Sequence, residues 1–179
     1  WTDNYVSEGN HAALAPSTEE IVTTCLSKDG KPLRWVRKND IYKYGKFTGT
    51  STLETALYNM AVDEMINNFE KDGTLRTGLY WGGVWTRDVS YSSLLSLAYM
   101  CPDKVKNSLE VKIDRMGRII QDTGTGGSWP CSSDRVVWAL SAWNIYLATG
   151  DIEWLQKAYP VIIKSLECDD MVVFNPQTG

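Results

Sequence analysis

A twelve-residue segment of the sequence combines side chains that together could bind a sugar. It reads YWGGVWTRDVSY over residues 80–91 and contains Trp81, Trp85 and the adjacent pair Arg87 and Asp88. A tryptophan ring can stack on the apolar face of a sugar, whereas a guanidinium donates and a carboxylate accepts hydrogen bonds from its hydroxyls. The two glycines between the tryptophans let the backbone approach a ligand closely. We therefore predict that these four side chains bind substrate.

A second segment has a similar composition and adds two candidates for the same site. It reads SWPCSSDRVVWALSAW over residues 128–143, and its candidates are Trp129 and Asp134. Both Asp88 and Asp134 precede apolar residues at helical spacing, so each is predicted to stand at a helix entrance. The alternative interpretation is purely structural, because aspartate is a preferred N-cap and is stabilised at a helix N-terminus.

The composition favours a carbohydrate ligand over a nucleic acid or a membrane. The chain of 179 residues has a net charge of −4, whereas nucleic-acid-binding proteins normally carry a basic surface. It contains eight Trp and nine Tyr but only three Phe, and no apolar run is long enough to cross a bilayer. The four cysteines form no C-x-x-C pair and His11 is the single histidine, so a zinc site is not expected. The pattern leaves disulfides open.

The order of apolar, capping and breaking residues predicts an all-α fold preceded by a short arm. Residues 1–50 are expected to form an extended arm or β-hairpin linker, with a turn at Asp29-Gly30. Residues 51–179 are expected to form a helical domain that begins with the capping box of Ser51 and Glu54. Apolar stripes and stop residues predict helices near 51–71, 88–100, 102–116, 134–149 and 151–167, the last four forming two antiparallel hairpins.

Details of the last two helices follow from the same patterns. Pro160 is expected to kink or split the final helix, and Gly150-Asp151 to form a hinge before it. The apolar stripe expected on the preceding helix consists of Val136, Leu140, Trp143 and Leu147. Because Asp88 and Asp134 lie 46 residues apart, the two helix entrances suggest stacked αα-hairpins.

These motifs resemble those of a known family of enzymes. The segment GVWTRDVSYSSLLSLAY at residues 83–99 resembles the Trp-x-Arg-Asp motif of the six-hairpin glycosidases, the (α/α)6 toroids that include glucoamylases and glycogen-debranching glucosidases. The second segment is similar to a later sugar-facing entrance, and ATGDIEWLQKAYPVI at residues 148–162 is similar to the family's helix–helix turn. The resemblance implies that residues 51–179 form an incomplete part of a toroid. It also implies that Trp85, Arg87 and Asp88 contact sugar, with Asp134 as a lesser candidate.

The resemblance further implies what the chain does and what it needs. It implies part of a glycoside hydrolase that cleaves oligo- or polysaccharides by an inverting mechanism with two carboxylates and no metal or organic cofactor. The catalytic residues are not assigned, because the family's general acid usually comes from a later segment. The expected partners are a carbohydrate and the rest of the toroid, from the same polypeptide or another chain, and a periplasmic or secreted location is favoured. The alternatives are a non-catalytic helical carbohydrate-binding module and a helical-repeat scaffold for proteins.

Overall fold

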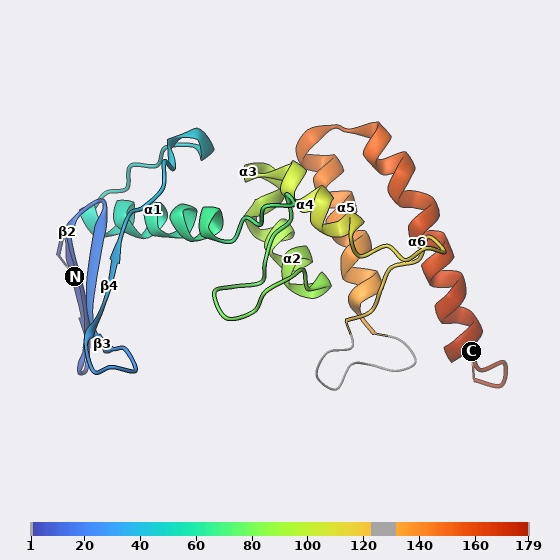
Figure 1. Ribbon diagram of the computed structural model, residues 1–179, viewed down its shortest axis with the longest axis horizontal. Coiled ribbons are helices and arrows are strands. Elements are labelled where there is room, and N and C mark those ends of the chain that lie inside the picture. The colour runs from blue at the N-terminus through green and yellow to red at the C-terminus, as the bar shows by residue number, and fades with distance from the viewer. Residues whose placement is uncertain (1, 123–131, 179) are drawn as a thin grey trace. The chain divides into compact units, whose positions relative to one another are not determined.

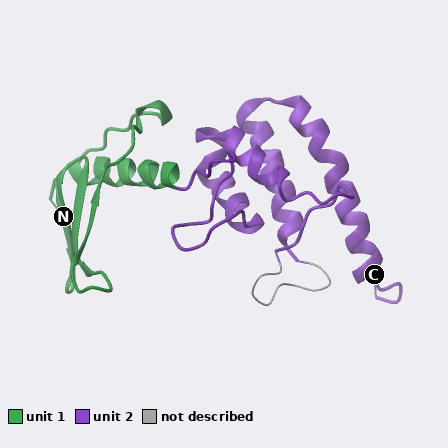
Figure 2. Cartoon of the chain, viewed as in Figure 1, with its two compact units in different colours: residues 1–67 green, residues 68–179 purple. Residues whose placement is uncertain are grey.

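The protein consists of two compact units, each with its own arrangement of elements (Figures 1 and 2). A computed structural model describes residues 2–122 and 132–178. Unit 1 comprises residues 1–67 and contains a sheet and one long helix, whereas unit 2 comprises residues 68–179 and is helical. The first long helix therefore groups with the sheet, although the sequence pattern placed it with the later helices.

The prediction of an all-α fold is wrong, because the N-terminal region forms a four-stranded antiparallel sheet. The strands follow chain order, each paired with the next, and their bounds are β1 Tyr5–Glu8, β2 His11–Ser17, β3 Glu20–Leu26 and β4 Pro32–Val36. The expected turn at Asp29-Gly30 is present between β3 and β4, with Gly30 at φ +73° and its N–H donating to the Ser27 carbonyl over 3.0 Å. The predicted hairpin is thus half of a larger sheet.

Strand β2 explains why the pattern underestimated the sheet. Its sequence, HAALAPS, is rich in alanine and lacks the β-branched residues that signal a strand. It forms nonetheless because it pairs with β1 on one side and β3 on the other, in a register that sets Tyr5 opposite Leu14. Its small Ala15 is fully buried in a cluster with Ile21 of β3 and Leu53 and Ala56 of the following helix. Tertiary pairing therefore overrides local propensity here.

Helix α1, Thr52–Asn67, starts at the predicted capping box and packs on the sheet. The Glu54 N–H donates to the Ser51 hydroxyl over 3.1 Å, and the Ser51 N–H donates to the Glu54 carboxylate over 3.2 Å. Thr50 adds its hydroxyl and its N–H, each 2.8 Å from the same carboxylate. These bonds, the Thr50 hydroxyl first, lower the pKa of Glu54. The capping box is confirmed.

Asp63 links this helix to the chain that follows β4. Its buried carboxylate accepts from the Trp35 indole N–H at 3.0 Å, from the Lys38 N–H at 3.2 Å and from the Asn39 N–H and side-chain amide at 2.9 and 2.8 Å. Burial alone raises the pKa of Asp63, but the four donors outweigh it and the pKa is lowered. The ionised carboxylate is therefore the form that holds β4 and its connection against α1.

The described residues of unit 2 form four helical runs close to those predicted. Helix α2, Thr86–Ser92, continues through a π-helical segment, η2 Ser93–Leu97, into α3, Ala98–Met100. The others are α4 Pro102–Glu110, α5 Asp134–Thr149 and α6 Ile152–Val173. Within residues 88–122 and 132–167, the sole strand-like pairing is one isolated bridge between Ile113 and Ile119. The expected helical architecture of this region is confirmed, although α4 is shorter than predicted.

The junction of α5 and α6 follows the predicted hinge, but Pro160 does not split the second helix. Gly150 adopts the left-handed conformation at φ +70°, and the Asp151 carboxylate accepts from the Trp154 N–H over 2.9 Å. Pro160 lies inside the continuous helix α6.

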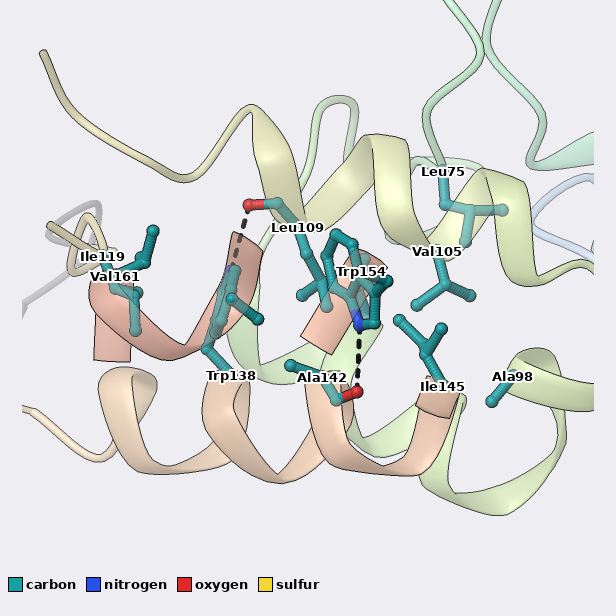
Figure 3. Packing of buried hydrophobic residues seen from close by; sticks show 12 residues of the cluster. Leu75, Ala98, Val105, Leu109, Ile119, Trp138, Ala142, Ile145, Trp154 and Val161 are labelled. Carbon is teal, nitrogen blue, oxygen red and sulfur yellow. Dashed lines mark hydrogen bonds between the residues drawn. The ribbon is translucent and has the colours of Figure 1, made fainter. Parts of the chain in front are cut away.

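The core of unit 2 is organised around two tryptophans, Trp138 of α5 and Trp154 of α6 (Figure 3). The Trp138 indole donates to the Leu109 carbonyl and the Trp154 indole to the Ala142 carbonyl, each over 3.0 Å. Their ring centroids lie 6.1 Å apart. The face of α5 in this core is offset from the predicted stripe, whose members Val136, Leu140, Trp143 and Leu147 are exposed.

The Asp63 carboxylate provides a test of what holds unit 1 together. We expect Asp63→Asn to lower the free energy of unfolding by roughly 2–4 kcal/mol, because an amide cannot accept from all four donors. Because the folded pKa lies below the unfolded one, the wild-type stabilisation should be complete above about pH 4 and decline as pH falls through the folded pKa. Urea unfolding between pH 2 and 7 measures both. The exposed Asp29→Asn is the matched control and should change little; equal effects would contradict the role of Asp63.

Candidate functional site

Arg87 and Asp88 lie in the first turn of α2. Neither Asp88 nor Asp134 is the N-cap of its helix. Trp85 occupies the N-cap position of α2 in an extended conformation, so Asp88 is the third residue of the helix. Ser133 is the N-cap of α5 and Asp134 is its first residue. The N-cap part of the structural alternative is therefore wrong for both aspartates, whereas both still lie in the first turn of a helix, where a carboxylate is stabilised.

Arg87 and Asp134 join the two helix entrances directly. The Arg87 guanidinium Nη1 lies 2.6 Å from Asp134 Oδ1. The Asp134 side chain is fully buried, whereas 41% of the Arg87 side chain is exposed. A charge-assisted hydrogen bond therefore holds the Arg87 guanidinium at Nη1, while part of the same side chain stays accessible to solvent. The structure thus brings together two residues that the sequence analysis named as candidates from separate segments.

Asp122 is a part of the same network that sequence reasoning missed. Its N–H donates to the second Asp134 carboxylate oxygen over 2.7 Å. Its own carboxylate accepts from the Thr86 N–H at the start of α2 over 2.5 Å and pairs with the Lys112 ammonium at 2.5 Å. Asp122 thus satisfies a backbone donor that the first turn of α2 cannot satisfy internally. The available signal was an acidic residue immediately before a glycine-rich segment.

The two tryptophans of the first segment lie edge to face beside this network. Their ring centroids are 5.8 Å apart at an interplanar angle of 87°. Trp85 is half-buried at the start of α2, whereas 56% of Trp81 is exposed in the preceding loop. Backbone hydrogen bonds in both directions between Trp81 and Gly78 hold that loop in a tight turn. Trp81 therefore presents its indole to solvent from a fixed backbone, and Trp129, the remaining candidate, lies outside the described residues.

Asp88 differs from the other acidic residues of this region because its carboxylate is exposed. Within residues 2–122 and 132–178 it makes no hydrogen bond and no ion pair. It directly follows Arg87, whose guanidinium is committed on one side to Asp134. The arrangement thus combines an exposed acceptor, an anchored donor and an exposed aromatic ring. In the same described residues, no group of three or more His, Cys, Asp or Glu side chains could hold a metal ion.

Comparisons with known proteins return nothing: no family model, no curated protein and no solved structure matches the chain. Among the described residues, no helix is both long enough and apolar enough to cross a membrane. Among the described residues, Cys25, Cys101 and Cys168 form no disulfide, and burial raises the pKa of the Cys101 thiol to about 11.

A double-mutant cycle on Arg87 and Asp134 tests whether their ion pair fastens the two helices. We expect Asp134→Asn to lower the free energy of unfolding by roughly 2–3 kcal/mol. The buried carboxylate accepts one hydrogen bond from the Arg87 guanidinium and one from the Asp122 N–H, and an amide cannot accept both. Arg87→Met should also destabilise, since it leaves a buried carboxylate without its ion-pair partner. The coupling energy between the two changes is expected at about 1–2 kcal/mol, reduced from the fully buried case by the exposure of Arg87.

The control for this cycle is Asp88→Asn, a substitution of an exposed carboxylate on the same helix turn. Chemical denaturation of the single and double variants gives all the terms. Additive effects of Arg87→Met and Asp134→Asn would show that the contact does not hold the helices together.

Proposed function

We propose that the surface formed by Trp81, Trp85, Arg87 and Asp88 binds a carbohydrate, and that the chain is part of a glycoside hydrolase. The observation that carries the proposal is the anchoring of Arg87 by the buried Asp134 next to an exposed carboxylate. A sugar presents pairs of neighbouring hydroxyls, each able to donate and to accept. A guanidinium and a carboxylate from one helix turn supply both kinds of partner for such hydroxyls, since one donates and the other accepts.

In this proposal the two aspartates have different roles. Asp134 is fully buried and its two oxygens are already engaged by Arg87 and by the Asp122 N–H. It acts as a positioning residue, because it reaches a ligand through Arg87 alone. Asp88 is exposed and its carboxylate has no competing contact in the described part of the chain. Asp88 is therefore the direct acceptor of a sugar hydroxyl.

The tryptophans supply the apolar part of the same site. Trp85 holds Trp81 through an edge-to-face contact, an arrangement that favours the ring pair beyond simple burial. The exposed indole of Trp81 then offers a flat surface on which the C–H face of a sugar ring can stack. Bond cleavage would follow the two-carboxylate mechanism of the resembling family. Neither Asp134, which is buried, nor Asp88, which is assigned to binding, is proposed as the general acid.

The decisive test of sugar binding uses Asp88→Asn. A hydrogen bond to a charged group is worth about 1.5–3 kcal/mol, so the change should weaken affinity for the bound oligosaccharide roughly 10- to 100-fold. The melting temperature should not move, because Asp88 makes no contact that holds the fold. The ligand is first found on an array of α- and β-linked gluco-, manno- and galacto-oligosaccharides, and the affinity is then measured by calorimetry.

Asp103→Asn is the matched control for Asp88→Asn, since Asp103 is also an exposed aspartate in the first turn of a helix, α4. It should leave affinity unchanged. Equal affinity of the wild type and Asp88→Asn would show that Asp88 does not bind the sugar. The absence of binding to every oligosaccharide would contradict the proposed function. Release of reducing sugar from a bound oligosaccharide separates a hydrolase from a non-catalytic carbohydrate-binding module.

The aromatic contribution is tested with Trp81→Ala. The substitution removes the stacking contact of the indole and the apolar area that it buries against the ligand. Affinity for the oligosaccharide should therefore fall roughly 10-fold or more. The control is Trp143→Ala on α5, which removes an indole of similar exposure from another surface. Intrinsic fluorescence titration compares the two. If both variants bind the oligosaccharide as the wild type does, stacking on Trp81 plays no part.

A further inference from the structure

Three polar side chains from three neighbouring strands of unit 1 lie in one row across the sheet. The register of β1 and β2 sets Glu8 opposite His11. The register of β2 and β3 sets Ala13 opposite Thr23, and its continuation by two residues sets His11 opposite Cys25. Residues directly opposite each other project from the same face of an antiparallel sheet. Glu8, His11 and Cys25 therefore share one face, with the imidazole in the middle.

The thiol and the imidazole of this row are in contact. Cys25 Sγ lies 3.8 Å from His11 Nδ1. A neutral imidazole has one protonated and one accepting nitrogen, so Nδ1 accepts the thiol proton in the tautomer that is protonated at Nε2. Transfer of this proton gives a thiolate beside an imidazolium. The thiolate is the nucleophilic form of cysteine, so the contact joins a nucleophile to a base.

The row lies where the sheet extends beyond helix α1. Ala15 and Ile21 project from the same face, and both are buried in the cluster that α1 forms with the sheet. Four residues further along their strands, His11 and Cys25 are exposed. Figure 1 shows β3 continuing past α1 toward its turn. The helix therefore covers one end of this face and leaves the other end open to small molecules.

A pocket of about 270 Å³ opens on the uncovered end of the face. Glu8, His11 and Cys25 all line it, together with the small apolar side chains of Val6 and Ala13. Among the described residues that line this pocket, Glu8 is the only acidic one, and none is a lysine or an arginine. A molecule that enters the pocket therefore meets a thiol, an imidazole and a carboxylate in sequence.

Cys168 of unit 2 provides a natural comparison, because its surroundings have the opposite charge. It is half-buried and accepts from Arg118 Nη1 over 3.5 Å. The pocket that it lines, of about 390 Å³, also contains Arg115 and Lys164, with one acidic residue. The chain thus presents one accessible thiol beside an imidazole and a carboxylate, and another among basic side chains.

We propose that Cys25 is a site of reversible S-thiolation by small disulfides that are neutral or positively charged, with His11 as the base. The Cys25–His11 contact supplies the nucleophile, and the pocket admits the disulfide. The Glu8 carboxylate gives the selectivity, because it attracts cationic reagents and repels anionic ones. The site lies in unit 1 and does not depend on sugar binding by unit 2.

The reaction is a thiol–disulfide exchange. The His11 imidazole takes the thiol proton, and the Cys25 sulfur attacks one sulfur of the disulfide. The S–S bond of the reagent breaks as the mixed disulfide forms, and the departing thiolate takes the proton back from the imidazolium. The reagent is the oxidant: one of its halves leaves as a reduced thiol, and the other stays bonded to Cys25.

The test lets Cys25 and Cys168 compete for one reagent in the reduced full chain at neutral pH. The reagents are cystamine, hydroxyethyl disulfide and dithiodiglycolate, which are small disulfides of positive, zero and negative charge. Peptide mass spectrometry gives the initial rate at each cysteine, and the intrinsic reactivity of the reagent cancels from the ratio of the two rates. We expect the ratio of Cys25 to Cys168 to be roughly 10-fold or more higher with cystamine than with dithiodiglycolate.

Two variants separate the base from the charge. His11→Asn should slow the reaction of Cys25 roughly 10-fold or more with every reagent and leave that of Cys168 unchanged. Glu8→Gln should reduce the charge preference of Cys25 about 3-fold or more. The matched control is Asp29→Asn, which removes an exposed carboxylate of the β3–β4 turn outside the pocket and should preserve that preference.

Two outcomes would overturn the proposal. The first is a Cys25 rate that is the same in His11→Asn as in the wild type, at equal melting temperature. The second is a ratio of Cys25 to Cys168 that does not change with the charge of the disulfide. The competition in the wild type decides the second point by itself, even where a variant fails to fold.

Discussion

The buried carboxylate of Asp134 is the constraint on which the candidate site depends. A charge without water is costly unless donors surround it, so the fold must bring donors to this position. Two of them come from different segments: the Arg87 guanidinium from the first turn of α2 and the Asp122 N–H from the chain between α4 and α5. Satisfying one buried acid therefore fixes three segments against one another. This buried contact therefore also positions the exposed part of the Arg87 side chain.

Unit 1 solves the same problem in a different architecture. Asp63 is buried where α1 meets the sheet, and its donors come from Trp35, Lys38 and Asn39. In both units a short acidic side chain connects elements that lie far apart in the sequence. The difference lies in what is connected: two donors to Asp63 are backbone N–H groups and two are the half-buried Trp35 and Asn39 side chains, whereas Asp134 anchors the Arg87 side chain, of which 41% is exposed. That difference makes the second network a candidate site and the first a structural support.

Local sequence signals predicted the helices, whereas elements that depend on pairing between distant segments were not predicted. Ser51 with Glu54 and Gly150 with Asp151 mark helix ends by contacts within a few residues, and such contacts are visible in a sequence. Strand β2 depends on both of its neighbours and carries little signal of its own. In the candidate site, the sequence identified Arg87 and Asp134 by their residue types and by their places at helix entrances. It did not show their contact, which joins residues 47 positions apart. Asp122 was missed because its role, accepting from the Thr86 N–H, exists only once α2 is in place.

The choice of the wrong face on α5 has a physical cause. In a stack of αα-hairpins, a helix meets neighbours on more than one side, so apolar residues occupy more than one stripe. Large residues at Leu140 and Leu147 drew the prediction to a face that is exposed, whereas Ala142 and Ile145 are buried beside the tryptophans of the core. A stripe of large residues shows that a helix face is apolar without showing which neighbour covers it. Which face of α5 is covered is set by its contacts with the other helices of the core, and these are not visible in the sequence of α5 itself.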